Sequence, residues 1–148
     1  MCVRRDVYSG RRRLDGEEHE ESLRAANNYA ASLKDQDSFE EARLLLRKTL
    51  PVARRVLGES NRITLTMRKI YAEALYDDDS STPDDFREAV ATLEEIERTA
   101  RRVMGGAHPL TGGTERELRY AQTVLSAREV DDVISVCEGV AAMTPWYA

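Results

Sequence analysis

The sequence has few cysteines, prolines and aromatic residues, and it has no long uninterrupted apolar segment. Two cysteines cannot form the disulfide framework of a small secreted domain, so we expect a reducing compartment. No segment approaches the ~20 consecutive apolar residues that a membrane-spanning helix needs, and the N-terminus lacks the apolar core of a secretory signal. From these absences we expect a cytoplasmic protein that has no membrane partner.

Positive charge is also in the minority. The 22 lysine and arginine residues face 27 aspartate and glutamate residues, which leaves a formal net charge of −5. This balance disfavours nucleic acid as the main partner, because an acidic protein repels the phosphate backbone. Apolar residues make up 41% and charged residues 33% of the chain. Such a mixture, over a length that corresponds to one domain, is typical of a folded helical protein.

Motifs for catalysis are missing as well. The sequence contains no phosphate-binding loop, no nucleophile elbow and no zinc-protease motif. The two histidines, His19 and His108, each follow a glycine by three residues. No metal-ligand spacing surrounds them, so we do not expect them to form a metal site. The acidic run 77–79 lacks the glycine and the terminal glutamate of a calcium loop. We therefore expect no enzyme, no metal and no cofactor.

What the chain does contain is a repeated pattern. Gly58 follows Gly16 after 42 residues, and the pair Tyr71-Ala72 follows Tyr29-Ala30 after the same interval. Tyr120-Ala121 gives a third copy 49 residues further on. A period in this range predicts a solenoid, because a single repeat of this size cannot bury its own apolar face.

The first and third copies carry motifs by which a repeat family is recognised. They are Gly16-Glu17-Glu18-His19, Ser22-Leu23, Asn27-Asn28-Tyr29-Ala30, Phe39-Glu40-Glu41-Ala42 and Val56-Leu57-Gly58, followed by Gly105, His108-Pro109 and Thr111. Over nearly all of residues 16–142 the chain resembles the tetratricopeptide repeat (TPR) in the 42-residue form of kinesin light chains. The resemblance implies an all-α fold, namely a right-handed α-solenoid of about three helix-turn-helix units. It also implies a concave groove, lined by the first helices, that holds an extended peptide.

The repeat divides the chain into three units between two short segments. The units are expected at 16–57, 58–104 and 105–143, after an N-terminal segment 1–15 and before a tail 144–148. The offsets place five extra residues within 76–86 and two within 111–114. The N-terminal segment holds the place of the second helix of a preceding repeat. The alternatives are a frayed terminus and, from Arg11-Arg12-Arg13, a phosphate-binding patch.

Each unit is expected to contain two helices, because apolar residues recur at spacings of three and four. The helices are predicted over about 21–34, 38–57, 63–76 and 83–103, from Thr114 onward, and over 129–142. The residues expected in the core of the last one are Val130, Val133, Cys137 and Val140. Capping boxes are predicted at Ser38 with Glu41 and at Thr114 with Glu117. Pro51 predicts a kink or a break in the second helix.

Partner binding is the function that the resemblance implies. Carried over by register, the outward-facing positions of the first helices are Arg24, Asn27, Lys34, Thr66, Lys69, Glu73, Tyr76 and Gln122. An asparagine there can hydrogen-bond a peptide backbone, and the basic side chains can pair with carboxylates. We therefore expect an adaptor that binds a protein or peptide. The alternative is a self-association module, a homodimer that uses the uncapped solenoid ends and the aromatic residues Trp146 and Tyr147.

Overall fold

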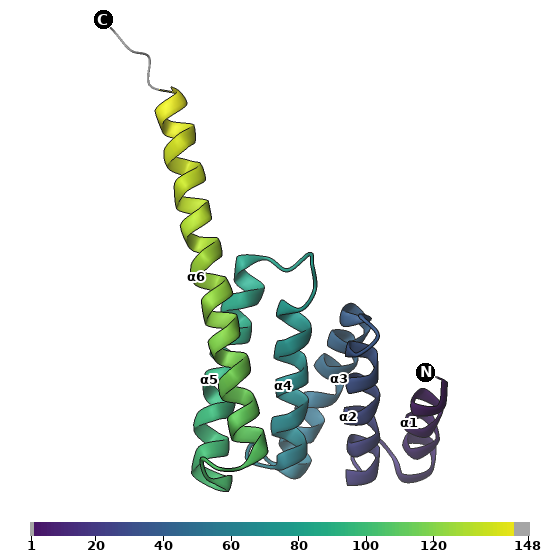
Figure 1. Ribbon diagram of the computed structural model, residues 1–148. Helices are drawn as coiled ribbons and strands as arrows, with labels where there is room; N and C mark the ends of the chain where they lie inside the picture. Colours follow the sequence, from purple (N-terminus) through teal and green to yellow (C-terminus); the bar gives the residue numbers. More distant parts are fainter. Residues whose placement is uncertain (1, 144–148) are drawn as a thin grey trace, which may run out of the picture.

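The fold was described from a computed structural model, in which the backbone is described for residues 2–143 and the side chains for residues 3–138. These residues form six helices and no strand (Figure 1). The helices are α1 (Cys2–Asp15), α2 (Glu20–Lys34), α3 (Phe39–Leu57), α4 (Arg62–Tyr76), α5 (Pro83–Met104) and α6 (Pro109–Met143). The predicted all-α class is confirmed. Trp146 and Tyr147 lie outside the described residues.

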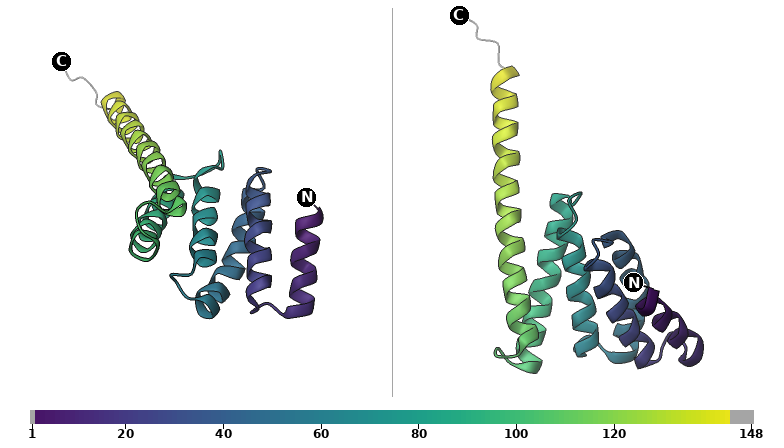
Figure 2. Two further views of the ribbon diagram at one scale, coloured as in Figure 1. Left: turned by 60° about the horizontal axis from the view of Figure 1, so that its bottom comes forward. Right: turned by 45° about the vertical axis from the view of Figure 1, so that its right-hand side comes forward.

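The helices stand side by side in a row that begins with α1 and ends with α6 (Figures 1 and 2). Each helix packs against the next one in the chain, and α4 also contacts α2 and α6. In Figure 1, α2, α4 and the lower half of α6 lie in front of α3 and α5. The upper half of α6 extends beyond the other helices. The first helices of the predicted units therefore share one face of the molecule.

Three glycines set the junctions between successive helix pairs. Gly16, Gly58 and Gly105 have φ angles of 88°, 89° and 87°. L side chains rarely adopt this region, whereas glycine enters it without steric cost. The helices α2, α4 and α6 each begin four residues after one of these glycines. The sequence repeat thus corresponds to a repeated backbone geometry.

A polar side chain caps the helix after each junction. His19, Asn61 and His108 lie three residues after Gly16, Gly58 and Gly105, respectively. Their side chains accept hydrogen bonds from the backbone N–H groups two residues further on, at 3.2, 2.8 and 3.1 Å respectively. These bonds satisfy donors that a helix N-terminus leaves unpaired. The two histidines are therefore N-caps, and Asn61 takes the same role in the middle unit.

The core is divided into clusters that adjacent helix pairs share. The cluster between α2, α3 and α4 consists of Leu23, Ala26, Ala30, Leu46, Leu50, Ala53, Met67 and Ile70. The cluster between α4, α5 and α6 consists of Ala72, Leu75, Tyr76, Phe86, Ala89, Leu93 and Ala121. Because α4 contributes to both, neither pair buries its apolar face alone.

Residues 2–15 belong to this row of helices. They form α1, which packs against α2 through the rings of Tyr8 and Tyr29, whose centroids lie 6.1 Å apart. Arg12 pairs with Glu17 at 2.5 Å just after the helix. The segment is therefore not frayed, and its origin in a preceding repeat stays a prediction.

The predicted turn of the third unit is wrong. Residues 109–143 form one helix of 35 residues, in which the two expected helices are fused. No glycine or proline stands between Gly113 and Gly139 to end the first of them. As a result, Val130, Val133 and Cys137 are exposed instead of buried. The structure gives two complete helix pairs, α2–α3 and α4–α5, with α1 before them and α6 after them.

The proposed third copy of the Tyr-Ala pair is also wrong. Tyr29 and Tyr71 lie 13 residues after their glycines, and Leu118 has this position after Gly105. Leu118 packs against the α4–α5–α6 cluster, whereas Tyr120 is 55% exposed. The predicted two-residue insertion is therefore absent before this point, since α6 begins at the same distance from its glycine as α2 and α4 do.

Two predicted capping boxes fail for reasons of backbone geometry. Ser38 has φ −85° and ψ 56° and makes no side-chain capping bond, so its capping box does not form. Thr114 lies inside α6, where its hydroxyl donates to the carbonyl of Leu110 at 2.7 Å. A capping box instead opens α5, between Thr82 and Asp85. Pro51 is exposed within α3, which continues past it, so a break does not occur and the alternative, a kink, stays a prediction.

The sequence offers no reason for Arg68, which stands where the first unit has Ala26. The structure provides one. Arg68 is buried, donates a hydrogen bond to Glu95 of α5 and lies 3.5 Å from Glu59 in the preceding loop. A buried charge is tolerated when it is paired in this way. Arg68 therefore ties α4 to its neighbours.

Candidate functional site

The face formed by α2 and α4 brings three of the predicted groove residues together. Lys34 Nζ lies 2.7 Å from Glu73 Oε2, and Lys69 Nζ lies 2.6 Å from Glu73 Oε1. Glu73 is only 5% exposed, whereas both lysines keep part of their surface in solvent. We call these three residues the Glu73 cluster. It joins the two first helices and presents two cations around one buried carboxylate.

Electrostatics keep Lys34 charged. Burial disfavours the ammonium of Lys34, but the hydrogen bond to Glu73 and its negative charge outweigh this effect and raise the pKa of Lys34. Lys34 is therefore protonated at neutral pH. Each ammonium group has three N–H donors and uses one for Glu73. The remaining donors are available to a second acceptor.

Tyr76 does not face outward as predicted. It is 5% exposed, and its ring lies 6.2 Å from that of Phe86 and 5.7 Å from that of Tyr120. Its hydroxyl donates to Glu117 of α6. Burial, together with this carboxylate, raises the pKa of Tyr76. The reason for the difference is α6, which runs past α4 and covers this position.

An acidic side chain borders the Glu73 cluster near the C-terminal end of α4. Burial, and then the charge of Glu73, raises the pKa of Asp77, while Lys34 opposes the rise. The C-terminal end of α4 is therefore rich in carboxylates. A cationic group entering the face is expected at this end, and an anionic group on the side of Lys69.

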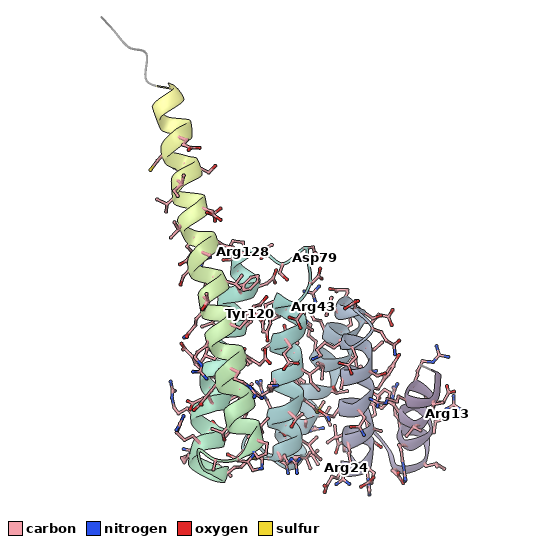
Figure 3. All side chains as sticks on the ribbon, in the orientation of Figure 1. Arg13, Arg24, Arg43, Asp79, Tyr120 and Arg128 are labelled. Carbon is pink, nitrogen blue, oxygen red and sulfur yellow. The ribbon has the colours of Figure 1, made fainter. Side chains whose placement is uncertain are left out.

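Of the other predicted residues, Arg24 and Gln122 lie apart from the cluster, whereas Thr66 lines the same pocket as Lys69 and Glu73. Arg24 is exposed near the start of α2 and pairs with Glu20 and Glu21 of its own helix, at 3.1 and 3.3 Å (Figure 3). Thr66 donates to the carbonyl of its own helix at Arg62. Gln122 faces α5, since its amide lies 3.3 Å from Glu94, so its predicted groove position is wrong.

Asn27 remains a candidate for peptide contact. It is half-buried, and its carbonyl oxygen has no hydrogen-bond partner among the described side chains and backbone. Its amide nitrogen lies 3.5 Å from the side-chain oxygen of Asn28, which is a weak contact. Unpaired polar atoms of this kind are uncommon in folded proteins. Because this oxygen is itself buried, it is not open to a ligand in this conformation, and the contact with a peptide stays a prediction.

A pocket of about 330 Å³ opens beside the Glu73 cluster. Its lining comes from α4, from the junction residue His108 and from the first two residues of α6, namely Arg62, Thr66, Lys69, Ile70, Glu73, His108, Pro109 and Leu110. Cationic and aliphatic side chains meet there, which suits a ligand with a carboxylate and an apolar group. Sequence reasoning missed Arg62, Ile70 and Leu110. The repeated glycine junction was the signal that could have placed Leu110 beside α4.

A second exposed surface lies on α6. Its distal half, residues 129–143, is called the α6 arm below. Val130, Val133, Ile134 and Val136 are large apolar side chains on the arm, and each is at least half exposed. Contiguous apolar surface of this kind commonly marks an interaction site.

Within the residues that the structure describes, no group of three histidine, cysteine, aspartate or glutamate side chains is arranged to hold a metal ion. Over the same residues, no helix combines the length and the apolar character that a membrane crossing demands. A scan against protein-family models finds no match for the chain, and a search of curated proteins finds none with similar sequence.

Proposed function

We propose that the protein is a TPR-like interaction module, a right-handed α-solenoid that binds a peptide or protein segment along α4, between Lys34 of α2 and the start of α6. The proposal makes it an adaptor rather than an enzyme, working in the cytoplasm that its low cysteine content favours. The observation that carries the proposal is the pocket of about 330 Å³ on the shared face of the first helices. The repeated glycine junctions support the solenoid architecture.

The charges around the pocket favour an acidic peptide. Arg62 and Lys69 line the pocket together with one carboxylate, that of Glu73, which Lys34 also neutralises, although the chain as a whole carries a net charge of −5. A carboxylate in the ligand can accept hydrogen bonds from the ammonium donors that Glu73 leaves unused. The aliphatic surface of Ile70 and Leu110 can hold a neighbouring apolar side chain.

Selection from a random peptide library, followed by fluorescence anisotropy on the selected peptides, tests this proposal. We expect enrichment of peptides with an acidic residue next to an aliphatic one. The double variant Arg62→Ala with Lys69→Ala is expected to weaken their binding at least about tenfold, because two charge-assisted contacts are lost. Arg98→Ala, on the outer side of α5, is the matched control. It removes a positive charge far from the pocket and should bind these peptides as tightly as the wild type does.

Self-association is the second candidate function. The observation that favours it is the exposed apolar surface of the α6 arm. A helix face that only contacts solvent would be expected to carry polar side chains, so the apolar surface indicates an interaction site. The aromatic anchor first expected for this function, Trp146 and Tyr147, lies outside the described residues. The exposed apolar side chains of the α6 arm lie within the described residues and define the surface for self-association.

A further inference from the structure

We propose that the α6 arm of one copy docks on α1 of a second copy of this chain. The inference assigns two surfaces to the self-association described above and therefore rests on that candidate function. The α2–α4 face takes no part in it.

The arm presents an apolar stripe that points away from the helical row. Val130, Val133, Ile134 and Cys137 are exposed and follow one another at spacings of three and four, so they share one side of the helix. Ala121, which α6 buries against α4 and α5, lies nine residues before Val130. Nine residues are two and a half helical turns, so the stripe is opposite the packed side of α6.

A matching stripe lies on α1. Val3 and Leu14 are 72% and 82% exposed, and Val7 lies between them on the same side of the helix. Gly10 also falls on this side, and a Cβ at its position would meet nothing within 4 Å. An interior glycine weakens a helix, so its position calls for a reason. Close approach of a second helix supplies one, because the missing side chain leaves a notch.

A hollow beside this stripe adds room for a side chain. It has a volume of about 370 Å³ and is lined by Arg4 and Val7 of α1 and by Ala25 and Asn28 of α2. An aliphatic residue of the arm can enter between the two helices there. The docking surface is thus a shallow groove beside the apolar stripe, lined by two aliphatic and two polar residues.

Charge decides which partner the arm accepts. Residues 129–138 contain four carboxylates and no lysine or arginine. Asp131 and Glu138, seven residues apart, border the apolar stripe on one side, and Glu129 borders it on the other. Two arms packed together would place carboxylates against carboxylates, which disfavours a dimer through the arm alone.

The charges of α1 are complementary. This helix contains five arginines and two aspartates. Arg4 and Arg11, again seven residues apart, border the stripe of Val3, Val7 and Leu14. Both are exposed, with weak contacts to the Asn28 carbonyl and to Asp15 at 3.3 Å. Both pairs lie on the same rotational side of their apolar stripes, so the arginine pair faces Asp131 and Glu138 when the two helices run antiparallel.

The contact has to form between copies. In Figures 1 and 2, α1 and the arm stand at opposite ends of the row, and Figure 3 places Arg13 of α1 far from Arg128 at the root of the arm. The two helical segments have similar lengths, about 21 Å for the 14 residues of α1 and about 22 Å for the 15 of the arm. One such contact is smaller than a standard interface of ~1,200 Å², so we expect weak association.

Sedimentation of the full untagged chain between about 5 and 500 µM tests the inference. We expect the average mass to rise with concentration. Two charge-reversed variants are compared with the wild type: Arg4→Glu with Arg11→Glu, and Asp131→Arg with Glu138→Arg. Each should need at least about tenfold more protein to reach the same average mass, because like charges then face each other across the contact. An equimolar mixture of the two variants should associate again, since every contact between unlike copies is then complementary.

Reversal of two exposed arginines elsewhere, Arg98→Glu with Arg102→Glu on α5, is the control and should leave association unchanged. Circular dichroism verifies that each variant is folded. Association of the Arg4 and Arg11 variant at the wild-type level would overturn the inference and leave self-association to another surface. A wild-type chain that stays monomeric to 500 µM would overturn the inference and the self-association together.

Discussion

Lys34 of α2 and Glu73 of α4 are 39 residues apart in the chain, yet Lys34 Nζ and Glu73 Oε2 lie 2.7 Å from each other. The pair joins the first helices of two successive units. It also fixes the position of Lys69, whose ammonium holds the other oxygen of the same carboxylate. The proposed binding face is therefore built around a buried, doubly paired glutamate.

Replacing that glutamate is expected to destabilise the fold. In Glu73→Ala, two partly buried ammonium groups lose their shared partner, and we expect a loss of about 1–3 kcal/mol in the free energy of unfolding. Urea denaturation at neutral pH measures it. Glu41→Ala, on an exposed position of α3, is the control and should stay within about 0.5 kcal/mol of the wild type. Equal stabilities of the two variants would contradict the role given to Glu73.

The junction glycines make a second prediction. Gly105 has a φ of 87° and open space around it, so Gly105→Ala is strained by its backbone alone and should cost about 1–3 kcal/mol. Gly112 lies inside α6 with equal space around it, and Gly112→Ala should instead stabilise the protein by about 0.5–1 kcal/mol. Thermal unfolding of both variants checks the opposite signs. A stabilising Gly105→Ala would show that the junction does not have this conformation.

The capping box of α5 predicts a dependence on pH. Hydrogen bonds from the backbone N–H and the hydroxyl of Thr82 lower the pKa of Asp85 below its ordinary value of 3.8. A lowered acid pKa adds stability above the ordinary value, and this stability is lost as the pH falls through the folded-state value. Asp85→Asn should therefore be less stable than the wild type at pH 7, by on the order of 1 kcal/mol, and nearly equal to it at pH 2. Urea titrations at both pH values provide the comparison.

The continuity of α6 is testable by substitution on the arm. Val133 is exposed, so Val133→Lys should change the free energy of unfolding by no more than about 0.5 kcal/mol. Leu93 is fully buried in α5, and Leu93→Ala should cost about 2–5 kcal/mol. A large loss in Val133→Lys, measured at a concentration where the chain is monomeric, would favour the folded-back helix that the repeat pattern predicts.

The outcome at α6 shows what the sequence repeat could and could not predict. The spacing of Gly16, Gly58 and Gly105 was sufficient to place the junctions, whereas the capping role of the residues three positions later was not predicted. The third unit failed because the period was extended through a segment without a turn-forming residue. The match of Tyr120 with Tyr71 rested on two letters and ignored the distance from Gly105, which assigns the position to Leu118.

The candidate face was predictable only in outline. Register placed Lys34, Lys69 and Glu73 on the outer side of the first helices, and the structure brings them together. Their pairing depends on how α2 and α4 are rotated relative to each other, which a single sequence does not specify. Tyr76 and Gln122 were misplaced for the same reason, because the path of α6 decides what covers them.

A nuclear magnetic resonance titration tests the central claim most directly. A selected acidic peptide is added to the isotopically labelled chain, and backbone amide shifts are mapped at low and at high salt. We predict shifts concentrated at Thr66, Lys69 and Ile70 on α4 and at Leu110, which weaken as salt screens the lysine and arginine charges. Shifts confined to the outer side of α5 around Arg98, with the α4 amides unchanged, would contradict the account.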